Sequence, residues 1–240
     1  MDTVRAAFRD ECVRLEEVLR GLDAADLDRP TPCPPWAVRD LLAHVRTGAG
    51  RLVGMLAAPA PERAEVDAAG YFGSAKFAPD VDRDRVDGAR REARELPGVP
   101  EVAEGFARAW RAADAAVAEQ PPGRLVRTRH GDAMALTEFL RTRVVEVAVH
   151  GLDLADALDR PPWLTPTAGQ VVADLLGDGS RSRRGGGRAE LESSDGRAVP
   201  EGLGWDALTL VRKATGRVPL TDAERAVLDR TGFRWLSFGG

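Results

Sequence analysis

The stretch from Arg141 to Leu158 constrains the fold more than any other part of this chain. It reads RTRVVEVAVHGLDLADAL, contains no proline and one glycine, and is long enough for about five helical turns. At 3.6 residues per turn nearly every position is apolar, except for one narrow polar arc formed by Arg143, Glu146, His150 and Asp153. A helix that is apolar almost all round is usually buried. The sequence therefore predicts a buried central helix that carries a polar stripe into the core.

Burial of that stripe requires partners, because an unpaired buried charge costs several kcal/mol as a rough estimate. Glu146 and His150 are four residues apart, so their side chains stack about 5–6 Å apart on one face and can share a divalent metal. His44, at the margin of an apolar seam on a second predicted helix, supplies a third ligand. Two histidines and one carboxylate leave positions open for water or substrate, as in catalytic sites. Zn²⁺ fits best as a redox-silent Lewis acid, and iron, nickel and manganese are the alternatives.

A simpler interpretation of the same spacing is also open. Glutamate and histidine four residues apart form an ordinary helix pair in many proteins, and His44 would then be a hydrogen-bonded core histidine. Spacing alone does not decide between this pair and a metal site.

The remaining pattern predicts a mainly all-α protein built on a four-helix bundle. Amphipathic helices are expected at 3–21, 37–56 and 102–119, and the fourth begins near Leu136. Prolines interrupt 22–36, a long connection with one short helix near 81–95 spans 57–98, and 124–134 includes a short extended piece. The bundle is predicted to occupy residues 1–160.

Residues 161–240 are expected to form a small, mostly helical C-terminal appendage. Short helices are predicted at 167–176, 205–214 and 222–229, and Thr221 with Glu224 forms a capping box for the last of them. The glycine- and arginine-rich segment 180–190 is predicted to be a flexible surface loop, and the apolar end FRWLSFGG to pack back onto the protein.

Charge and cysteine content exclude several classes of protein. The 34 basic and 38 acidic side chains are interspersed and give a net charge of −4, which argues against nucleic-acid and membrane partners. Two cysteines, no signal-peptide core and no apolar run of membrane length indicate a cytoplasmic protein. Arginine outnumbers lysine so strongly that we infer a GC-rich genome, for example an actinobacterial one. The pattern leaves open whether the protein is a monomer or a homodimer.

Two segments resemble one known family. The stretch DRPTPCPPWAVRDLLAHV at 28–45 is similar to the N-terminal signature of the mycothiol-dependent maleylpyruvate isomerases, which belong to the DinB-like four-helix bundles. TRVVEVAVHGLDLADAL at 142–158 resembles that family's second signature, in the same order and at a similar separation. The resemblance covers residues 5–160. It implies a divalent metal, typically zinc, held by His44, Glu146 and His150, and it implies that Asp153 helps to position the thiol cofactor mycothiol.

Other residues have weaker claims to a functional role. The family's isomerases carry an α/β domain at the C-terminus that residues 165–240 do not match, so the isomerase reaction itself stays open. Arg217 is a candidate for holding a substrate carboxylate in a two-pronged contact, with an ordinary surface arginine as the alternative. His130 is interpreted as a loop histidine, Cys33 as a packed thiol without a base beside it, and Trp36 as a structural anchor.

These observations favour a metal-dependent enzyme that activates a low-molecular-weight thiol, mycothiol, for attack on a small electrophilic substrate. The thiolate either leaves again after bond rotation, which is isomerisation, or stays attached, which is S-transfer. Metal-dependent hydrolysis by an activated water is one alternative. A non-catalytic bundle that binds a metal or ligand is another.

Overall fold

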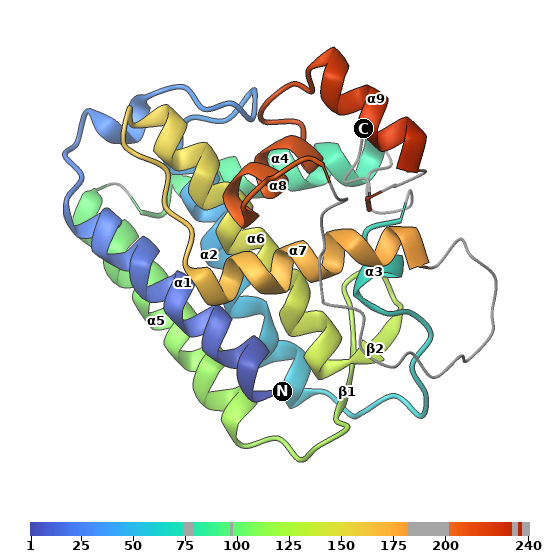
Figure 1. Cartoon of the computed structure of the whole chain (residues 1–240). Helices are drawn as coiled ribbons and strands as arrows, with labels where there is room; N and C mark the ends of the chain where they lie inside the picture. Colours follow the sequence, from blue (N-terminus) through green and yellow to red (C-terminus); the bar gives the residue numbers. More distant parts are fainter. Residues whose placement is uncertain (74–78, 97, 182–201, 232–234, 237–240) are drawn as a thin grey trace.

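A four-helix bundle forms the body of the protein. The computed structural model describes the whole chain except residues 74–78, 97, 182–201, 232–234 and 237–240. The bundle consists of α1 (Asp2–Arg20), α2 (Val38–Ala57), α5 (Val99–Ala118) and α6 (Leu136–Ala157) (Figure 1). α1 and α2 each pack against both α5 and α6. The predicted bundle is confirmed. The third helix begins at Val99 and not at 102. Pro100 is compatible with its first turn, because the backbone N–H groups there have no partner within the helix.

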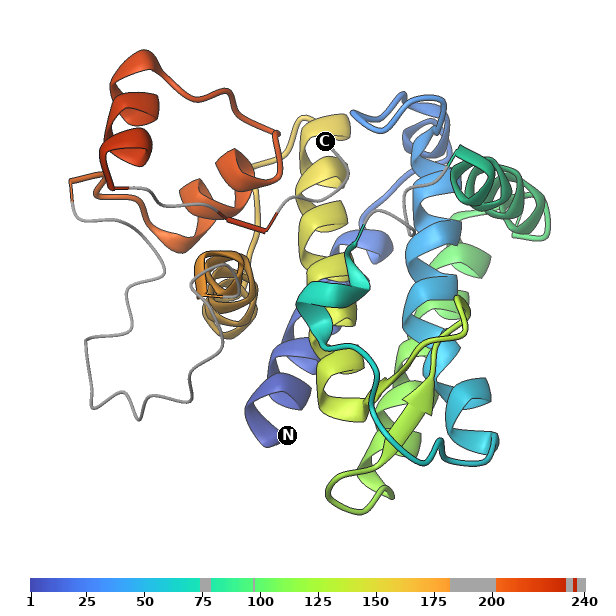
Figure 2. The same ribbon diagram turned by 90° about the vertical axis from the view of Figure 1, so that its right-hand side faces the viewer.

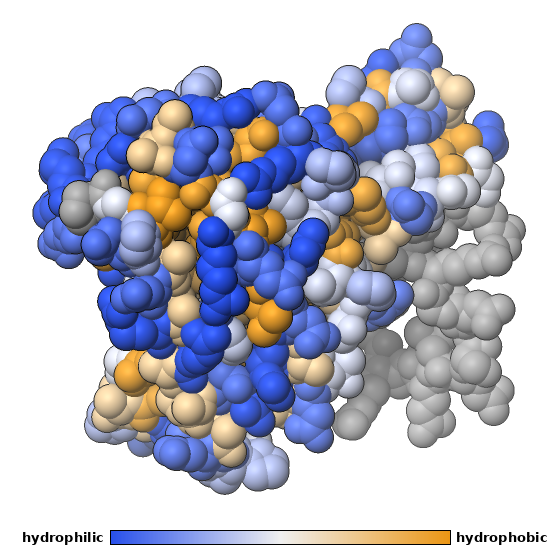
Figure 3. Space-filling model, turned by 90° about the vertical axis from the view of Figure 1, so that its left-hand side faces the viewer, coloured by the Kyte–Doolittle hydropathy of each residue, from blue (hydrophilic) through white to orange (hydrophobic). Residues whose placement is uncertain are grey.

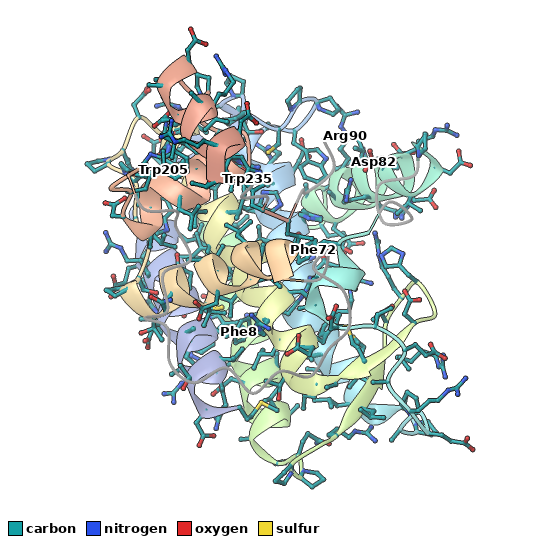
Figure 4. All side chains as sticks on the ribbon, turned by 45° about the vertical axis from the view of Figure 1, so that its right-hand side comes forward. Phe8, Phe72, Asp82, Arg90, Trp205 and Trp235 are labelled. Atoms are coloured by element: carbon teal, nitrogen blue, oxygen red, sulfur yellow. The ribbon has the colours of Figure 1, made fainter. Side chains whose placement is uncertain are left out.

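Helix α6 occupies the centre of the molecule, as its sequence predicts. Figure 2 shows it with α2 on one side and the C-terminal helices on the other. Most of its residues are buried, including the charged Arg143 and Asp153. Apolar side chains fill the core between the helices, among them Phe139 of α6 and Phe8 of α1, which Figure 4 labels. The polar stripe of α6 thus lies inside the protein.

The connections add two helices and a hairpin. Between α2 and α5 lie α3 (Ala68–Tyr71) and α4 (Pro79–Ala93), and α4 packs against α2. The sequence predicted one helix there; α3 is additional, and the Asp67 carboxylate caps it by accepting from the Gly70 N–H at 2.7 Å. The short extended piece predicted at 124–134 is an antiparallel hairpin of β1 (Leu125–Arg127) and β2 (Ala133–Ala135). A 3₁₀ turn, η1 (Asp26–Asp28), lies in the proline-rich segment that was expected to lack regular structure.

The C-terminal segment packs along the bundle. α7 (Pro166–Arg181) contacts α1 and α6 and extends beyond the predicted 167–176, while α8 (Ala207–Ala214) packs against α7. α9 (Asp222–Thr231) begins with the predicted capping box: the Glu224 N–H donates to Thr221 Oγ1 at 3.3 Å and the Thr221 N–H to Glu224 Oε2 at 2.8 Å. Most of the predicted 180–190 loop lies outside the described residues. A domain boundary near residue 160 stays a prediction.

The described part of the tail lies against the body of the protein. The Leu236 N–H donates to the Leu176 carbonyl at 3.0 Å, and the Trp235 ring lies 6.3 Å from that of Trp205 (Figure 4). The face in Figure 3 is mainly hydrophilic, with smaller apolar areas between charged residues. Among the helices described, none combines the length and the hydropathy that a bilayer crossing requires.

Candidate functional site

A cavity of about 410 Å³ opens between α2, α4 and α6, beside the segment that follows α8. Its size is that of a small-molecule site. Phe72, at the end of α3, and Asp82, on α4, both line it (Figure 4). The residues that could carry chemistry come from every wall: Cys33, Trp36, His44, Arg51, Tyr71, Arg85, Arg129, Arg143, Glu146, His150 and Arg217. Arg143, Glu146 and His150 of the polar stripe of α6 form the floor of this cavity.

The three predicted metal ligands converge there. His44 Nε2 lies 2.5 Å from Glu146 Oε1, and His150 Nε2 lies 3.6 Å from the same oxygen. One donor atom from each residue lies within 4.8 Å of the other two. Two imidazoles and one carboxylate are a ligand set that zinc and other first-row divalent metals bind. The residues present therefore fit a divalent ion.

Asp153 fixes the orientation of one of these imidazoles. Its Oδ2 lies 2.9 Å from His150 Nδ1, and its side chain is fully buried. A carboxylate in this position holds a proton on Nδ1, so Nε2 is the nitrogen that faces Glu146. Carboxylate–histidine pairs of this kind support metal sites. Asp153 thus acts on the ligand set from behind and does not itself line the cavity.

Asp153 also gathers two residues that are distant in sequence. Arg217 donates from Nε to Oδ1 at 3.0 Å and from Nη2 to Oδ2 at 2.8 Å. The Cys33 thiol donates to Oδ2 at 3.2 Å. Arg217, Cys33 and His150 therefore meet around one carboxylate, at one end of the cavity.

Mutual interactions set the charges of this cluster. Burial opposes ionisation of Glu146, but both histidines and Arg143 outweigh it and hold its pKa well below the ordinary value. Burial also opposes the charge of His150, yet Asp153, Cys33 and Glu146 raise its pKa well above the ordinary value. For His44 burial prevails and lowers the pKa. The pKa of Asp153 is low because His150 and Arg217 outweigh its burial.

Arg143 completes the floor of the cavity. It is 3 % exposed; its Nη2 lies 3.6 Å from Glu146 Oε2 and donates to the Tyr71 hydroxyl at 3.4 Å. Gly48 of α2 makes room for it, since a Cβ at this position would lie 3.2 Å from Arg143 Nη1 and 3.4 Å from Glu146 Cγ. The spacing between α2 and α6 at the ligands thus depends on a glycine.

All of the site residues predicted from the sequence lie at or beside the cavity. The structure brings His44, Glu146, His150, Asp153 and Arg217 together around one cavity. The two-pronged contact expected of Arg217 is made with Asp153, so its role toward a substrate carboxylate stays a proposal. His130 lies in the hairpin, where its ring is 5.9 Å from that of Tyr71, and Trp36 packs 4.8 Å from the ring of His44.

Sequence reasoning missed several residues of the cavity wall. Cys33 was interpreted as a thiol without a base, yet it lies beside Asp153. Its signal was its place in the same proline-rich signature that ends at His44. Arg51, Arg85 and Arg129 gave no signal, because single arginines are frequent in this chain and their meeting depends on α4 and the hairpin.

Comparison with solved structures agrees with the overall fold. Two solved structures match with probability 1.00 and a TM-score of 0.51: a mycothiol-dependent maleylpyruvate isomerase and a histidine-to-alanine mutant of such an enzyme. The identities are 16% and 14%; the matches cover 75% and 77% of this chain and 71% and 72% of the solved chains. At these identities the likeness shows the fold. A search of curated proteins found no significant relative.

A sequence profile decides the family. The profile of the mycothiol maleylpyruvate isomerase N-terminal domain matches residues 8–155, which is more than half of the chain and includes the three candidate metal ligands. The chain belongs to the family of the mycothiol maleylpyruvate isomerase N-terminal domain.

Proposed function

We propose that this protein is a divalent-metal-dependent enzyme that activates mycothiol for isomerisation of, or S-transfer to, a small electrophilic molecule. The observation that carries the proposal is the convergence of His44, Glu146 and His150 on one cavity, with Asp153 orienting His150 from behind. Membership of the family supports mycothiol as the thiol. Zinc is the proposed metal on the chemistry of the donor set.

His44, Glu146 and His150 would hold the ion. A divalent ion held there would lower the pKa of a bound thiol and so supply a nucleophile at neutral pH, with the thiol proton released to solvent. All three residues line the cavity, which has room for a thiol and a substrate beside them.

The residues around the ligands orient the reactants. Asp153 holds His150 in one tautomer and fixes the plane of its ring. Arg217 is held by Asp153 and by the Thr215 carbonyl, to which its Nη1 donates at 2.8 Å. A guanidinium fixed in this way is available for contact with a polar group of the thiol or with a carboxylate of the substrate. Cys33 and Arg217 therefore define the end of the cavity that we assign to the thiol.

Cobalt substitution tests the proposal. With Co²⁺ in place of the native ion, a thiol that binds at the metal through sulfur produces an intense near-ultraviolet charge-transfer band. We expect this band on addition of mycothiol, with a weaker apparent affinity in Asp153→Ala, because positioning is lost while cobalt stays bound. The release of about one proton per bound thiol should accompany it.

Asp156→Ala is the matched control for the Asp153 variant. Asp156 lies on the same helix and accepts from Arg212 Nη2 at 3.0 and 2.8 Å, so it also pairs an arginine of the C-terminal segment, away from the ligands. The control should leave the mycothiol titration unchanged. If no thiol changes the spectrum of the cobalt protein, thiol activation is refuted. Metal-dependent hydrolysis or non-catalytic binding would then be the better proposal.

A further inference from the structure

Arg51 of α2 lines the cavity and has no counter-ion among the residues that the structure describes. Three other arginines of the cavity have carboxylate contacts: Arg217 with Asp153, Arg85 with Asp82, and Arg143 with Glu146. Arg51 makes no hydrogen bond or ion pair with any residue that the structure describes. A half-buried guanidinium that lacks an anion loses hydration without compensation.

The surroundings of Arg51 are themselves cationic. Burial lowers its pKa, and the charges of Arg129 and Arg143 lower it further, against weaker opposing effects of Tyr71 and Glu146. Arg129, in the hairpin, donates from Nε to His130 Nε2 at 3.2 Å and has no carboxylate partner among the described residues.

The acidic residues of the same cavity do not neutralise this group. Glu92 is engaged by Arg46, at 3.0 Å, and by the Thr47 hydroxyl, while Glu146 belongs to the ligand set. Asp84 is exposed on α4. Positive charge is therefore concentrated at the Arg51 end of the cavity.

This end is distinct from the end occupied by Arg217. α2 and α6 run antiparallel across the cavity floor: His44 contacts Glu146, and Gly48 faces Arg143. Seven residues of helix separate His44 from Arg51, which is about 10 Å along the axis. Asp153 and Arg217 lie beyond His150, on the opposite side of the ligands. The ligand set thus lies between two arginine-containing ends.

We propose that Arg51 and Arg129 form an anion-binding subsite that holds a carboxylate or phosphate group of the substrate, while the Arg217 end holds the thiol. The proposal rests on the proposed function and names its substrate class: small electrophiles that carry an anionic group remote from the carbon attacked by sulfur. Planar guanidinium groups bind carboxylates and phosphates through paired hydrogen bonds, and an anion would supply the missing counter-charge. A cavity of about 410 Å³ has room for such a molecule.

The melting temperature of an Arg51 variant distinguishes a role in ligand binding from a role in holding the fold together. Because Arg51 faces like charges and has no counter-ion in the described part of the chain, Arg51→Gln should leave the melting temperature of the ligand-free holoprotein unchanged or raise it. An arginine needed for packing would lower it instead. Arg108→Gln is the matched control, since Arg108 is exposed on α5 and lies 3.3 Å from Glu104 alone among the described residues.

Binding is measured by calorimetric titration of the metal-loaded protein with succinate and, separately, with inorganic phosphate. We expect the preferred anion to bind Arg51→Gln roughly tenfold more weakly than wild type, and Arg108→Gln as tightly as wild type. Arg51→Lys should recover part of the affinity, because it restores the charge without the paired donors. Added salt should weaken binding to wild type more than to Arg51→Gln. The two probes distinguish a carboxylate substrate from a phosphate ester.

The proposal fails if wild type binds neither anion, or if Arg51→Gln binds both as tightly as wild type does. It also fails if Arg51→Gln loses the cobalt–thiol band, because Arg51 would then serve the thiol. If the anion titrations succeed while no thiol produces the band, the subsite is supported and thiol activation is refuted. Failure of the two proposals is thereby distinguishable.

Discussion

Asp153 and Arg217 are 64 positions apart in the chain, yet both carboxylate oxygens of Asp153 accept hydrogen bonds from one guanidinium. The same Oδ2 lies 2.9 Å from His150 Nδ1. Asp153 is fully buried, and each of its contacts is to a group that stabilises its charge. A single carboxylate therefore couples the C-terminal segment to a candidate metal ligand.

Removal of this charge should destabilise the protein. Asp153→Asn preserves the shape of the side chain but leaves Arg217 and His150 without their anion. Loss of one partner of a buried ion pair typically costs about 3–5 kcal/mol, and we expect the lower end because Arg217 is partly exposed. The free energy of unfolding from urea titration measures the effect.

A double-mutant cycle identifies the partner. Asp153→Asn combined with Arg217→Gln should cost clearly less than the sum of the two single changes, because the second change removes the uncompensated charge. Strict additivity would show that the pair contributes nothing to stability.

Metal content tests the ligand set directly. The protein purified from cells should hold about one divalent ion per chain, and His44→Ala, Glu146→Ala and His150→Ala should each lose most of it, because two remaining ligands bind weakly. His130→Ala is the control, since this histidine lies in the hairpin and outside the ligand set. Elemental analysis measures the stoichiometry. Full metal content in all three ligand variants would overturn the assignment.

The periodicity of the sequence predicted those contacts that depend only on the geometry of a single helix. The apolar surround of α6 required burial, and the polar residues on its stripe now make successive contacts: Arg143 with Glu146, Glu146 with His150, and His150 with Asp153. Residues three and four apart on a helix face one another wherever the helix lies, so this geometry follows from sequence.

Helical periodicity could not predict contacts between segments that are far apart in the sequence. Cys33 reaches Asp153 across 120 positions, because the proline-rich segment turns back before α2. Arg129 enters the cavity wall through a hairpin of two very short strands. Neither placement has a periodic signal, since tertiary packing determines both. The resemblance to a family implied the same ligand set that helix spacing indicated, but it gave no information on this wall.

The close approach of α2 and α6 at Gly48 should be sensitive to one methyl group. In Gly48→Ala the new Cβ presses on Arg143 Nη1, which must move by a few tenths of an ångström, and it packs directly against Glu146 Cγ. We expect weaker metal binding, measured as a lower chelator concentration for half removal of the ion. The gain in helix propensity, up to about 1 kcal/mol, should be largely cancelled.

Gly54→Ala provides the comparison on the same helix. Outside the adjacent residues and the backbone of its own helix, no described atom lies within 4 Å of the Cβ that this change adds. It should raise the free energy of unfolding by up to about 1 kcal/mol and leave the metal affinity unchanged. If the two variants bind metal equally well, Gly48 does not set the geometry of the ligands.

A second buried carboxylate, Glu11 of α1, should make stability depend on pH. Glu11 is fully buried, and its Oε2 accepts from the Thr165 N–H at 2.9 Å and from the Thr165 hydroxyl at 2.7 Å, just before α7. Its Oε1 has no hydrogen-bond partner among the described residues. Burial raises its pKa above the ordinary value of 4.5, against the smaller effect of the Thr165 hydrogen bonds. The folded protein thus binds this proton more tightly than the unfolded chain does.

The sign of the pH effect follows from that difference. The contribution of Glu11 to stability is fully present below about pH 4.5 and is lost as the pH rises through the raised pKa, at about 1.4 kcal/mol per unit by which the pKa is raised. Glu11→Gln has no proton to lose, so its unfolding free energy relative to wild type should increase from pH 4 to pH 7. Glu17→Gln, an exposed change on the same helix, removes the same charge without burial. Urea titrations across this range measure both differences, and parallel curves for the two variants would show that the Glu11 carboxylate does not oppose folding at neutral pH.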